Sequence, residues 1–185
     1  MQEEQNPWQI KRSKQVYENP WISLTEYDVI NPSGGDGIYG KVHFKNTAIG
    51  IITLTDDLKT HLVGQFRFSL SQYSWEIPEG GAPEGSDPLK GAKRELLEET
   101  GLKADEWQLL LNMHLSNSIS DEYAFIYLAR QLTQYAPEPE ETEQLAIKEF
   151  PFDEVYEMVN DGRITDSISI AAVLKLKLMM VNGQL

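Results

Sequence analysis

The 185 residues of the chain, 41% hydrophobic and 24% charged, are enough for one globular domain with a sizeable core and a short extension. A formal net charge of −13 argues against a broad binding surface for nucleic acid or an anionic membrane, and the absence of cysteine excludes disulfides and thiolate chemistry. Because neither a signal-peptide pattern nor an apolar run of membrane-spanning length is present, we expect a cytoplasmic protein.

The first third of the chain predicts strands. Residues 8–30 alternate in places between apolar and polar side chains, as a half-buried strand does. The turn-forming segment 31–37 follows, so residues 38–44 are expected to return as the second arm of a hairpin. The apolar, β-branched runs 48–54 and 62–68 predict two buried strands.

A helix is predicted from Pro88 to Gly101. Asp87 suits the N-cap, proline fits the first turn, and glycine ends a helix in the left-handed conformation. One face is expected to pack against the protein and the other to point outward. The packing face consists of Leu89, Ala92, Leu96 and Thr100.

The rest of the chain alternates between strands and helices. Residues 107–115 and 123–132 predict strands, with an acidic, proline-broken loop after them. Residues 152–160 and 167–181 predict two helices.

Strands that precede, interrupt and follow the central helix indicate an α+β fold. We expect an α/β/α sandwich in which a mixed β-sheet lies between helices. Residues 1–45 are assigned to an N-terminal β extension and residues 46–185 to the main domain. No linker is long enough to suggest a wider separation of the two parts.

The central helix carries a ridge of like charges. Glu95, Glu98 and Glu99 stand at positions i, i+3 and i+4, so they share one face. Such a face costs stability unless positive charge lies among the carboxylates. Hard oxygen ligands in this arrangement suit Mg²⁺ or Mn²⁺, whereas the plainer alternative is a solvated acidic face. Spacing alone does not decide between them.

The residues around the ridge resemble the Nudix hydrolase signature, G-x5-E-x7-R-E-U-x-E-E-x-G-U, where U is a bulky aliphatic residue. All but one of its defined positions match, at Gly80, Arg94, Glu95, Leu96, Glu98, Glu99, Gly101 and Leu102. The exception is Ser86, which stands where the signature has its first glutamate. This departure concerns the loop before the helix more than the metal ligands, and a serine there is still able to accept a bond from a helix N–H.

Further segments are similar to the ADP-ribose pyrophosphatases and related nucleoside-diphosphate-sugar hydrolases. They are residues 63–67 and 75–78 before the signature, residues 161–167, and the N-terminal strand pair. In these relatives that strand pair often builds a swapped homodimer, so the resemblance implies one here. ADP-ribose enzymes commonly have a Ser-Pro-Gly segment after the signature, but Asn117 replaces its proline, which leaves nucleotide sugars open as substrates.

The resemblance implies how the metal ions are held. Glu95 and Glu99 are the expected main ligands of Mg²⁺, with Mn²⁺ as an alternative, and the backbone carbonyl of Glu79 is a further ligand. Glu98 is expected to bind another metal ion or to orient the attacking water. Arg94 is expected to hold a carboxylate in place through a charge-assisted pair.

The resemblance also places the general base in the acidic loop after the signature. We favour Glu141, with Glu143 close behind, because a carboxylate near metal-bound water is suited to accept its proton. The alternative for any single glutamate of this loop is a solvated side chain.

Four residues are candidates for binding the substrate. Arg67 leaves the strand before the signature, and its guanidinium suits phosphate oxygens. Glu76 follows in the same region, and Glu122 is a candidate acceptor for a sugar hydroxyl. Trp21 is a candidate for stacking on the base across a dimer, although a core or interface position is the plainer interpretation.

The function implied is Mg²⁺-dependent hydrolysis of the diphosphate bond in ADP-ribose or a nucleoside-diphosphate sugar, giving a nucleoside monophosphate and a sugar phosphate. The alternative is a non-catalytic Nudix module that senses a nucleotide sugar, and Ser86 is its best support. A Nudix enzyme acting on RNA ends is a third possibility, against which the acidic composition argues.

Overall fold

The computed structural model describes residues 5–136 and 145–185. The described chain forms two compact units. The first contains the residues up to Asn46 together with Ser116–Glu122, and the second contains Thr47–Leu115 and Tyr123–Leu185. Within the described part of the chain, none of the helices combines the length and the apolar character that a membrane crossing requires.

The first unit is a three-stranded antiparallel sheet. Its strands are β1 (Gln9–Glu18), β2 (Ile22–Ile30) and β3 (Asp36–Phe44), with β2 in the middle. The predicted hairpin turn lies between β2 and β3, where the side chain of Asn31 accepts hydrogen bonds from two backbone amides and Gly34 has a φ of 85°. The alternating segment 8–30 therefore forms two paired strands.

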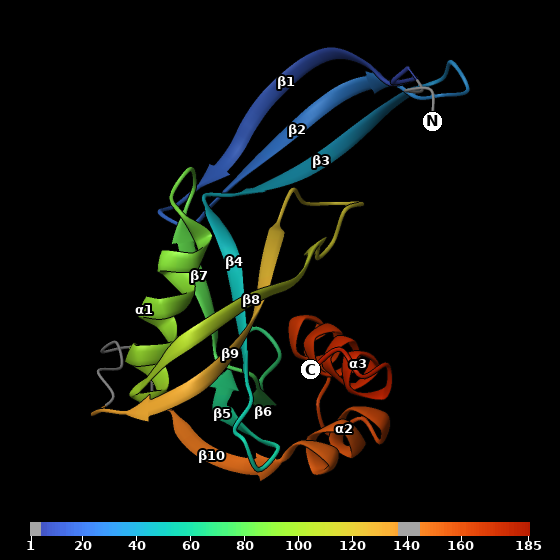
Figure 1. Cartoon of the computed structure of the whole chain (residues 1–185). Coiled ribbons are helices and arrows are strands. Elements are labelled where there is room, and N and C mark those ends of the chain that lie inside the picture. Colours follow the sequence, from blue (N-terminus) through green and yellow to red (C-terminus); the bar gives the residue numbers. More distant parts are fainter. Residues whose placement is uncertain (1–4, 137–144) are drawn as a thin grey trace. The chain divides into compact units, whose positions relative to one another are not determined.

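The described residues of the second unit form two sheets and three helices, which Figure 1 labels. The four-stranded sheet has the order β7-β4-β9-β8, and the three-stranded sheet has the order β10-β5-β6. The strands of the first are β7 (Glu79–Pro83), β4 (Asn46–Thr53), β9 (Tyr123–Gln134) and β8 (Leu102–His114). Those of the second are β10 (Ala146–Pro151), β5 (Lys59–Arg67) and β6 (Gln72–Glu76). Since β4 is parallel to β9 and β8 is antiparallel to it, the sheet is mixed, as predicted.

The three helices lie on opposite sides of the four-stranded sheet (Figure 1). The first, α1 (Pro88–Thr100), contacts β7, β8 and β9. On the other side, α3 (Ser167–Val181) contacts β8 and β9, and α2 (Phe152–Asn160) contacts α3 and the strands β5 and β10. The predicted α/β/α sandwich is confirmed, and the two C-terminal helices have the predicted bounds.

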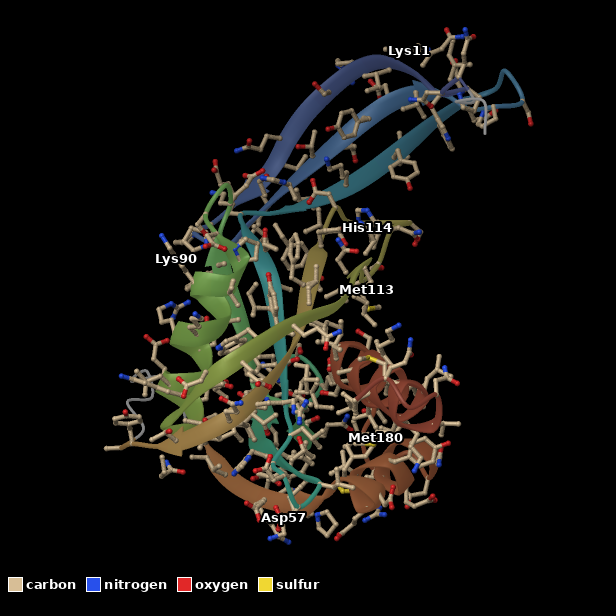
Figure 2. All side chains as sticks on the ribbon, viewed as in Figure 1. Lys11, Asp57, Lys90, Met113, His114 and Met180 are labelled. Atoms are coloured by element: carbon tan, nitrogen blue, oxygen red, sulfur yellow. The ribbon has the colours of Figure 1, made fainter. Side chains whose placement is uncertain are left out.

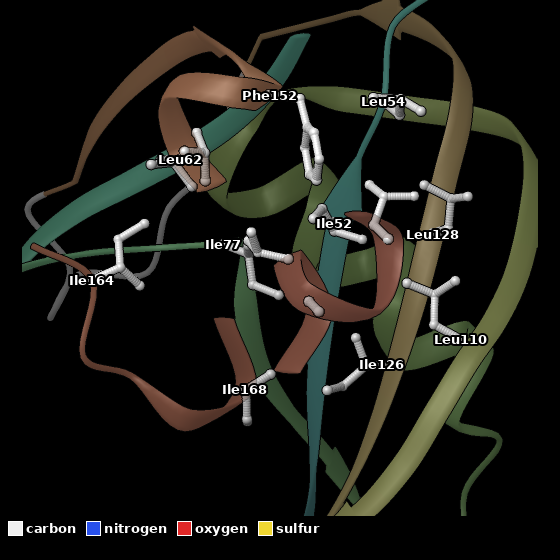
Figure 3. Close-up of a cluster of buried hydrophobic side chains, with 14 of the residues drawn as sticks. Ile52, Leu54, Leu62, Ile77, Leu110, Ile126, Leu128, Phe152, Ile164 and Ile168 are labelled. Atoms are coloured by element: carbon white, nitrogen blue, oxygen red, sulfur yellow. The ribbon is translucent and has the colours of Figure 1, made fainter. Parts of the chain in front are cut away.

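Alternation along β4 divides the core into two clusters. Ile49 and Ile51 face the α1 side, where they pack with Leu96. Ile52 faces the other side, where it joins the larger cluster that includes Phe152 of α2 (Figure 3). Two methionines, Met113 of β8 and Met180 of α3, are partly buried against that larger cluster (Figure 2).

Strands β6 and β7 were not predicted from the sequence. The segment that forms β7, Glu-Gly-Gly-Ala-Pro, contains residues that are rare in strands, so local propensity gives no signal there. Its position is set by the fold instead: Pro78, just before β7, accepts a backbone hydrogen bond of 2.8 Å from Ile51 of β4. A long-range contact therefore overrides weak local preference.

Gly50 allows α3 to approach the sheet closely. A Cβ atom at this position would lie 2.4 Å from the Cγ2 atom of Ile168, which is buried. The Cδ1 atom of Ile77 would lie 3.2 Å from the same added Cβ atom, so Ile168 and Ile77 would both have to shift.

Gly50→Ala is therefore expected to lower the free energy of unfolding by about 1–3 kcal/mol through overpacking, as measured by urea denaturation. Gly40→Ala is the matched control, since the nearest atom to its Cβ would be 4.0 Å away. Equal stability of the two variants would contradict the proposed role of Gly50 in seating α3.

Candidate active site

The acidic helix α1 is fixed at both ends. The side chain of Asp87 accepts a hydrogen bond of 3.0 Å from the amide of Leu89, and Gly101 ends the helix with a φ of 71°. Ser86 does not cap the helix, because its hydroxyl donates to the carbonyl of Pro83 at 2.6 Å. The helix start therefore depends on Asp87, and the departure from the signature at Ser86 leaves the cap intact.

Two of the three ridge glutamates are buried, so the prediction that this face points outward was wrong for them. The exposed fraction is 8% for Glu95 and 2% for Glu99. The physical reason is that β7 lies beside the ridge and offers backbone donors, which the sequence pattern did not predict. Glu98 remains partly exposed.

Backbone amides of β7 hold the two buried carboxylates. The N–H of Glu79 donates to Oε2 of Glu99 at 3.0 Å, and the N–H of Gly81 donates to Oε1 of Glu95 at 2.9 Å. Gly80, between them, makes this approach possible. A Cβ atom at Gly80 would lie 2.2 Å from the carboxyl carbon of Glu95. A side chain at Gly80 would therefore displace the carboxylate of Glu95 from its present position.

Arg94 supplies part of the positive charge that the carboxylates of the ridge need. Its guanidinium donates to the carboxylates of Glu95 and Glu98 and to the carbonyl of Gly81, the last at 2.7 Å. The charge-assisted pair predicted for Arg94 is therefore present, and it joins the helix to β7.

The ridge has an excess of negative charge. Burial raises the pKa of Glu95 above its ordinary value, even though the charge of Arg94 and the amide of Gly81 act in the opposite direction. Arg94 pairs with Glu95 and Glu98, so one guanidinium serves two carboxylates and does not neutralise them. Additional positive charge would stabilise the ionised carboxylates.

The donor set of the ridge fits a hard divalent cation. In the part of the chain that the structure describes, no three acidic or histidine side chains converge into a complete metal-binding cluster. Mg²⁺ does not require one, because it usually binds through one or two carboxylates and keeps water and substrate oxygens as its other ligands. Glu95 and Glu99, held by β7, are suited to that mode.

Arg67 and Glu76, both expected to bind substrate, bind each other. The Nε atom of Arg67 lies 2.9 Å from Oε2 of Glu76, and a terminal nitrogen of the same guanidinium contacts both Glu76 and Glu79. These side chains line a pocket of about 380 Å³ together with Asp166. Burial, and then Asp166 and Glu76, raise the pKa of Glu79 well above its ordinary value. Sequence reasoning considered only the backbone carbonyl of Glu79 and did not anticipate this side-chain contact.

Four further candidate residues belong to the first unit or lie outside the described residues. Trp21 and Glu122 belong to the first unit, and Trp21 is 65% exposed, so it is not a core residue of the described unit. Glu141 and Glu143, the candidates for the general base, lie outside the described residues. The roles of these four residues stay predictions.

Asp121 is a structural residue that the sequence analysis missed. Its carboxylate accepts hydrogen bonds from Lys41 and His43 of β3 and from the amide of Phe44, at 2.8, 2.9 and 3.1 Å. Burial opposes the ionised form, but the hydrogen bonds from Lys41 and His43 outweigh it and lower the pKa of Asp121 to about 2. This residue ties the segment Ser116–Glu122 to β3.

A mixed sheet thus lies between helices, and backbone amides of the glycine-containing strand β7 hold the buried carboxylates of α1. The NUDIX domain matches residues 45–169, and the nucleoside diphosphate sugar hydrolase N-terminal domain matches residues 8–42. The first match spans more than half of the chain. The chain belongs to the Nudix family.

Individual relatives agree with this assignment. The chain is 30% identical over 169 residues to the methanol dehydrogenase activator of Bacillus methanolicus, covering 90% of this chain and 91% of that protein. It is 33% identical over 150 residues to the ADP-ribose pyrophosphatase of Mycobacterium tuberculosis, covering 80% and 72%. A crystal structure of an ADP compounds hydrolase has the same fold, with a TM-score of 0.86, 18% identity and full coverage of both chains. The predicted family is confirmed, and with it the hydrolase class.

Asp121→Asn is expected to lower the free energy of unfolding of the first unit by about 1 kcal/mol at pH 7, after allowance for solvent screening. The pKa of Asp121 falls from 3.8 to about 2 on folding. The extra stability of the wild type over the variant is therefore fully present above pH 3.8 and is lost as the pH falls through about 2. The difference in stability between the wild type and the variant is measured by hydrogen exchange of the Phe44 amide between pH 2 and pH 7. An advantage that does not change over this range would contradict the assignment.

Proposed function

We propose that the protein hydrolyses the diphosphate bond of ADP-ribose or of a nucleoside-diphosphate sugar, with Mg²⁺ as the natural cation and Mn²⁺ as a substitute. The observation that carries this proposal is the attachment of Glu95 and Glu99 to the backbone of β7. It keeps two carboxylates in place beside the surface where a diphosphate would bind. The name of the mycobacterial relative, ADP-ribose pyrophosphatase, supports the substrate class.

When bound, divalent cations would offset the negative charge that develops on the phosphates and would lower the pKa of the attacking water. The chain's own residues have separate tasks. Glu95 and Glu99 hold cations, and the carbonyl of Glu79 is a further candidate ligand. Arg94 orients Glu95 and Glu98, which leaves Glu98 placed to bind a second cation or the water. Glu141 or Glu143 would accept the proton of the water.

The non-catalytic sensor is disfavoured. Its main support was Ser86, yet the helix cap is made by Asp87 and the three ridge glutamates are all present. The acidic composition continues to argue against an RNA substrate.

The proposal is tested with a panel of ADP-ribose and ADP-, UDP- and GDP-sugars in the presence of Mg²⁺ or Mn²⁺. Products are converted by a phosphatase and the phosphate released is measured. Hydrolysis of at least one substrate, abolished by EDTA and restored by the metal, is expected. Calorimetric binding of a nucleotide sugar without any product would favour the sensor instead.

Glu99→Gln is expected to reduce kcat by at least about a hundredfold, because it removes a charged cation ligand. The fold is expected to remain, since the amide oxygen of glutamine still accepts the N–H of Glu79. Steady-state kinetics and circular dichroism measure the two effects. Glu106→Gln, which alters an exposed glutamate of β8, is the control. Unchanged kinetics of Glu99→Gln would refute the metal assignment.

We also propose that residues 1–45 are a dimer-forming extension and that the protein acts as a cytoplasmic homodimer. The first unit supports this, because its sheet has a face on which Trp8 and Ile10 of the N-terminal segment and Tyr39 of β3 are exposed around a hollow of about 370 Å³. An uncovered apolar face of this kind is usual where a partner binds.

Ile10→Glu is expected to shift the protein from dimer to monomer in sedimentation equilibrium, since it buries a charge at the proposed interface. Ile38→Glu makes the same substitution on the opposite face of the sheet, since Ile38 is exposed and pairs with Asp28 and not with a residue of the hollow, and it is expected to leave the dimer intact. Equal behaviour of both variants would argue against this face as the dimer contact.

A further inference from the structure

We propose that the side of α1 away from the glutamate ridge forms, together with the start of β8, a second ligand site that takes a nucleoside monophosphate. The site is a pocket of about 320 Å³ in the second unit. Its lining residues are Lys93, Arg94 and Leu97 of α1 and Lys103, Ala104 and Trp107 of β8. Apart from Arg94, which the pocket shares with the ridge, none of them has a part in the proposed hydrolysis.

The helical repeat separates this pocket from the candidate metal ligands. Lys93 stands two residues before Glu95, and Leu97 stands two residues before Glu99. Two positions turn an α-helix by about 200°, so these side chains leave α1 on different sides. Strand β8 starts directly after the end of the helix and contacts it, which brings its first residues to the pocket side.

The floor of the pocket is apolar and held in place. Trp107 is partly buried against the core cluster on the α1 side. Its Nε1 atom donates to the carbonyl of Ala104 at 2.9 Å, and its ring packs edge to face on Tyr127 with the centroids 6.3 Å apart. Leu97 adds further apolar surface. The indole therefore has a defined position without any ligand, and a fixed aromatic ring is a surface on which a nucleobase stacks.

The rim of the pocket is positive, although acidic residues outnumber basic ones in the chain by 29 to 16. The Nζ atom of Lys93 lies 5.9 Å from the centroid of the Trp107 ring, and that of Lys103 lies 4.5 Å from the centroid of the Tyr135 ring. Among the described residues, no acidic side chain lines the pocket and neither lysine has a carboxylate partner. Other lysines are paired with carboxylates, namely Lys11, Lys41, Lys45, Lys59 and Lys177.

These features define the class of ligand. Two ammonium groups without a carboxylate partner suit a phosphate, and the apolar floor suits the base of the same molecule. The guanidinium of Arg94 adds positive charge, but its hydrogen bonds go to Glu95 and Glu98. Ligand pockets usually measure about 300–1,000 Å³, so this one is at the small end. Its size favours a mononucleotide over a larger nucleoside-diphosphate sugar.

Calorimetry on the full chain in EDTA tests the proposal with AMP, adenosine and inorganic phosphate as probes. EDTA removes metal-dependent binding at the ridge from the measurement. AMP is expected to bind at least about tenfold more tightly than either of the other probes, because only AMP combines a stacking base with a phosphate. In nuclear magnetic resonance spectra, AMP is expected to shift the indole N–H signal of Trp107, which is assigned with Trp107→Phe.

Charge reversal locates the site. Lys93→Glu and Lys103→Glu are each expected to weaken AMP binding by at least about tenfold, because repulsion of the phosphate replaces attraction. The Mn²⁺ affinity of the ridge is expected to stay within about threefold of the wild type in both variants. Lys148→Glu is the matched control, since the Nζ atom of Lys148 also lies over an aromatic ring, 4.4 Å from the centroid of Phe150 on β10. It is expected to leave AMP binding unchanged.

Four outcomes would overturn the inference. Absence of AMP binding would mean that the lysine side chains only shield the indole from water. Equal affinity for AMP and adenosine, or for AMP and phosphate, would remove the nucleotide assignment. An unmoved Trp107 signal, or wild-type AMP affinity in the lysine variants, would place AMP elsewhere. Either lysine variant decides the last point if the other does not fold, and none of these outcomes alters the test of the proposed hydrolysis.

Discussion

The attachment of two buried carboxylates to the backbone of one short strand is the interaction on which the site depends. Burying Glu95 and Glu99 is unfavourable unless each receives hydrogen bonds and nearby positive charge. Amides of β7 provide the hydrogen bonds, and Arg94 provides part of the charge. A divalent cation would contribute the positive charge that is still lacking. The uncompensated negative charge that destabilises the folded protein therefore also favours metal binding.

The rest of the second unit keeps β7 and α1 together. The carbonyl of Pro78 accepts a backbone hydrogen bond from Ile51 of β4, which fixes the start of β7 beside this central strand. On the other side, α3 packs closely because Gly50 has no side chain. The sandwich therefore keeps β7 and α1 against each other, and Arg67 contacts the side chain of Glu79, the first residue of β7.

Much of the fold was predictable from local patterns. The bounds of α2 and α3 and both ends of α1 followed from caps and apolar periodicity, because these signals lie within the helix itself or next to it. Strand β7 was not predictable, since glycine and proline give no strand signal. The expectation of an outward-facing ridge failed for the same reason: without β7, nothing indicated what Glu95 and Glu99 would face.

The sequence by itself determined which groups carry the chemistry and their order along α1, because the helical repeat places residues three and four apart on one face. Only the tertiary structure decided what those groups contact. Glu79 lies 20 residues before Glu99, and Gly81 lies 14 before Glu95. Arg67 is 12 residues from Glu79. Contacts at such separations depend on how strands and helices pack together, and no local pattern of residues contains that information.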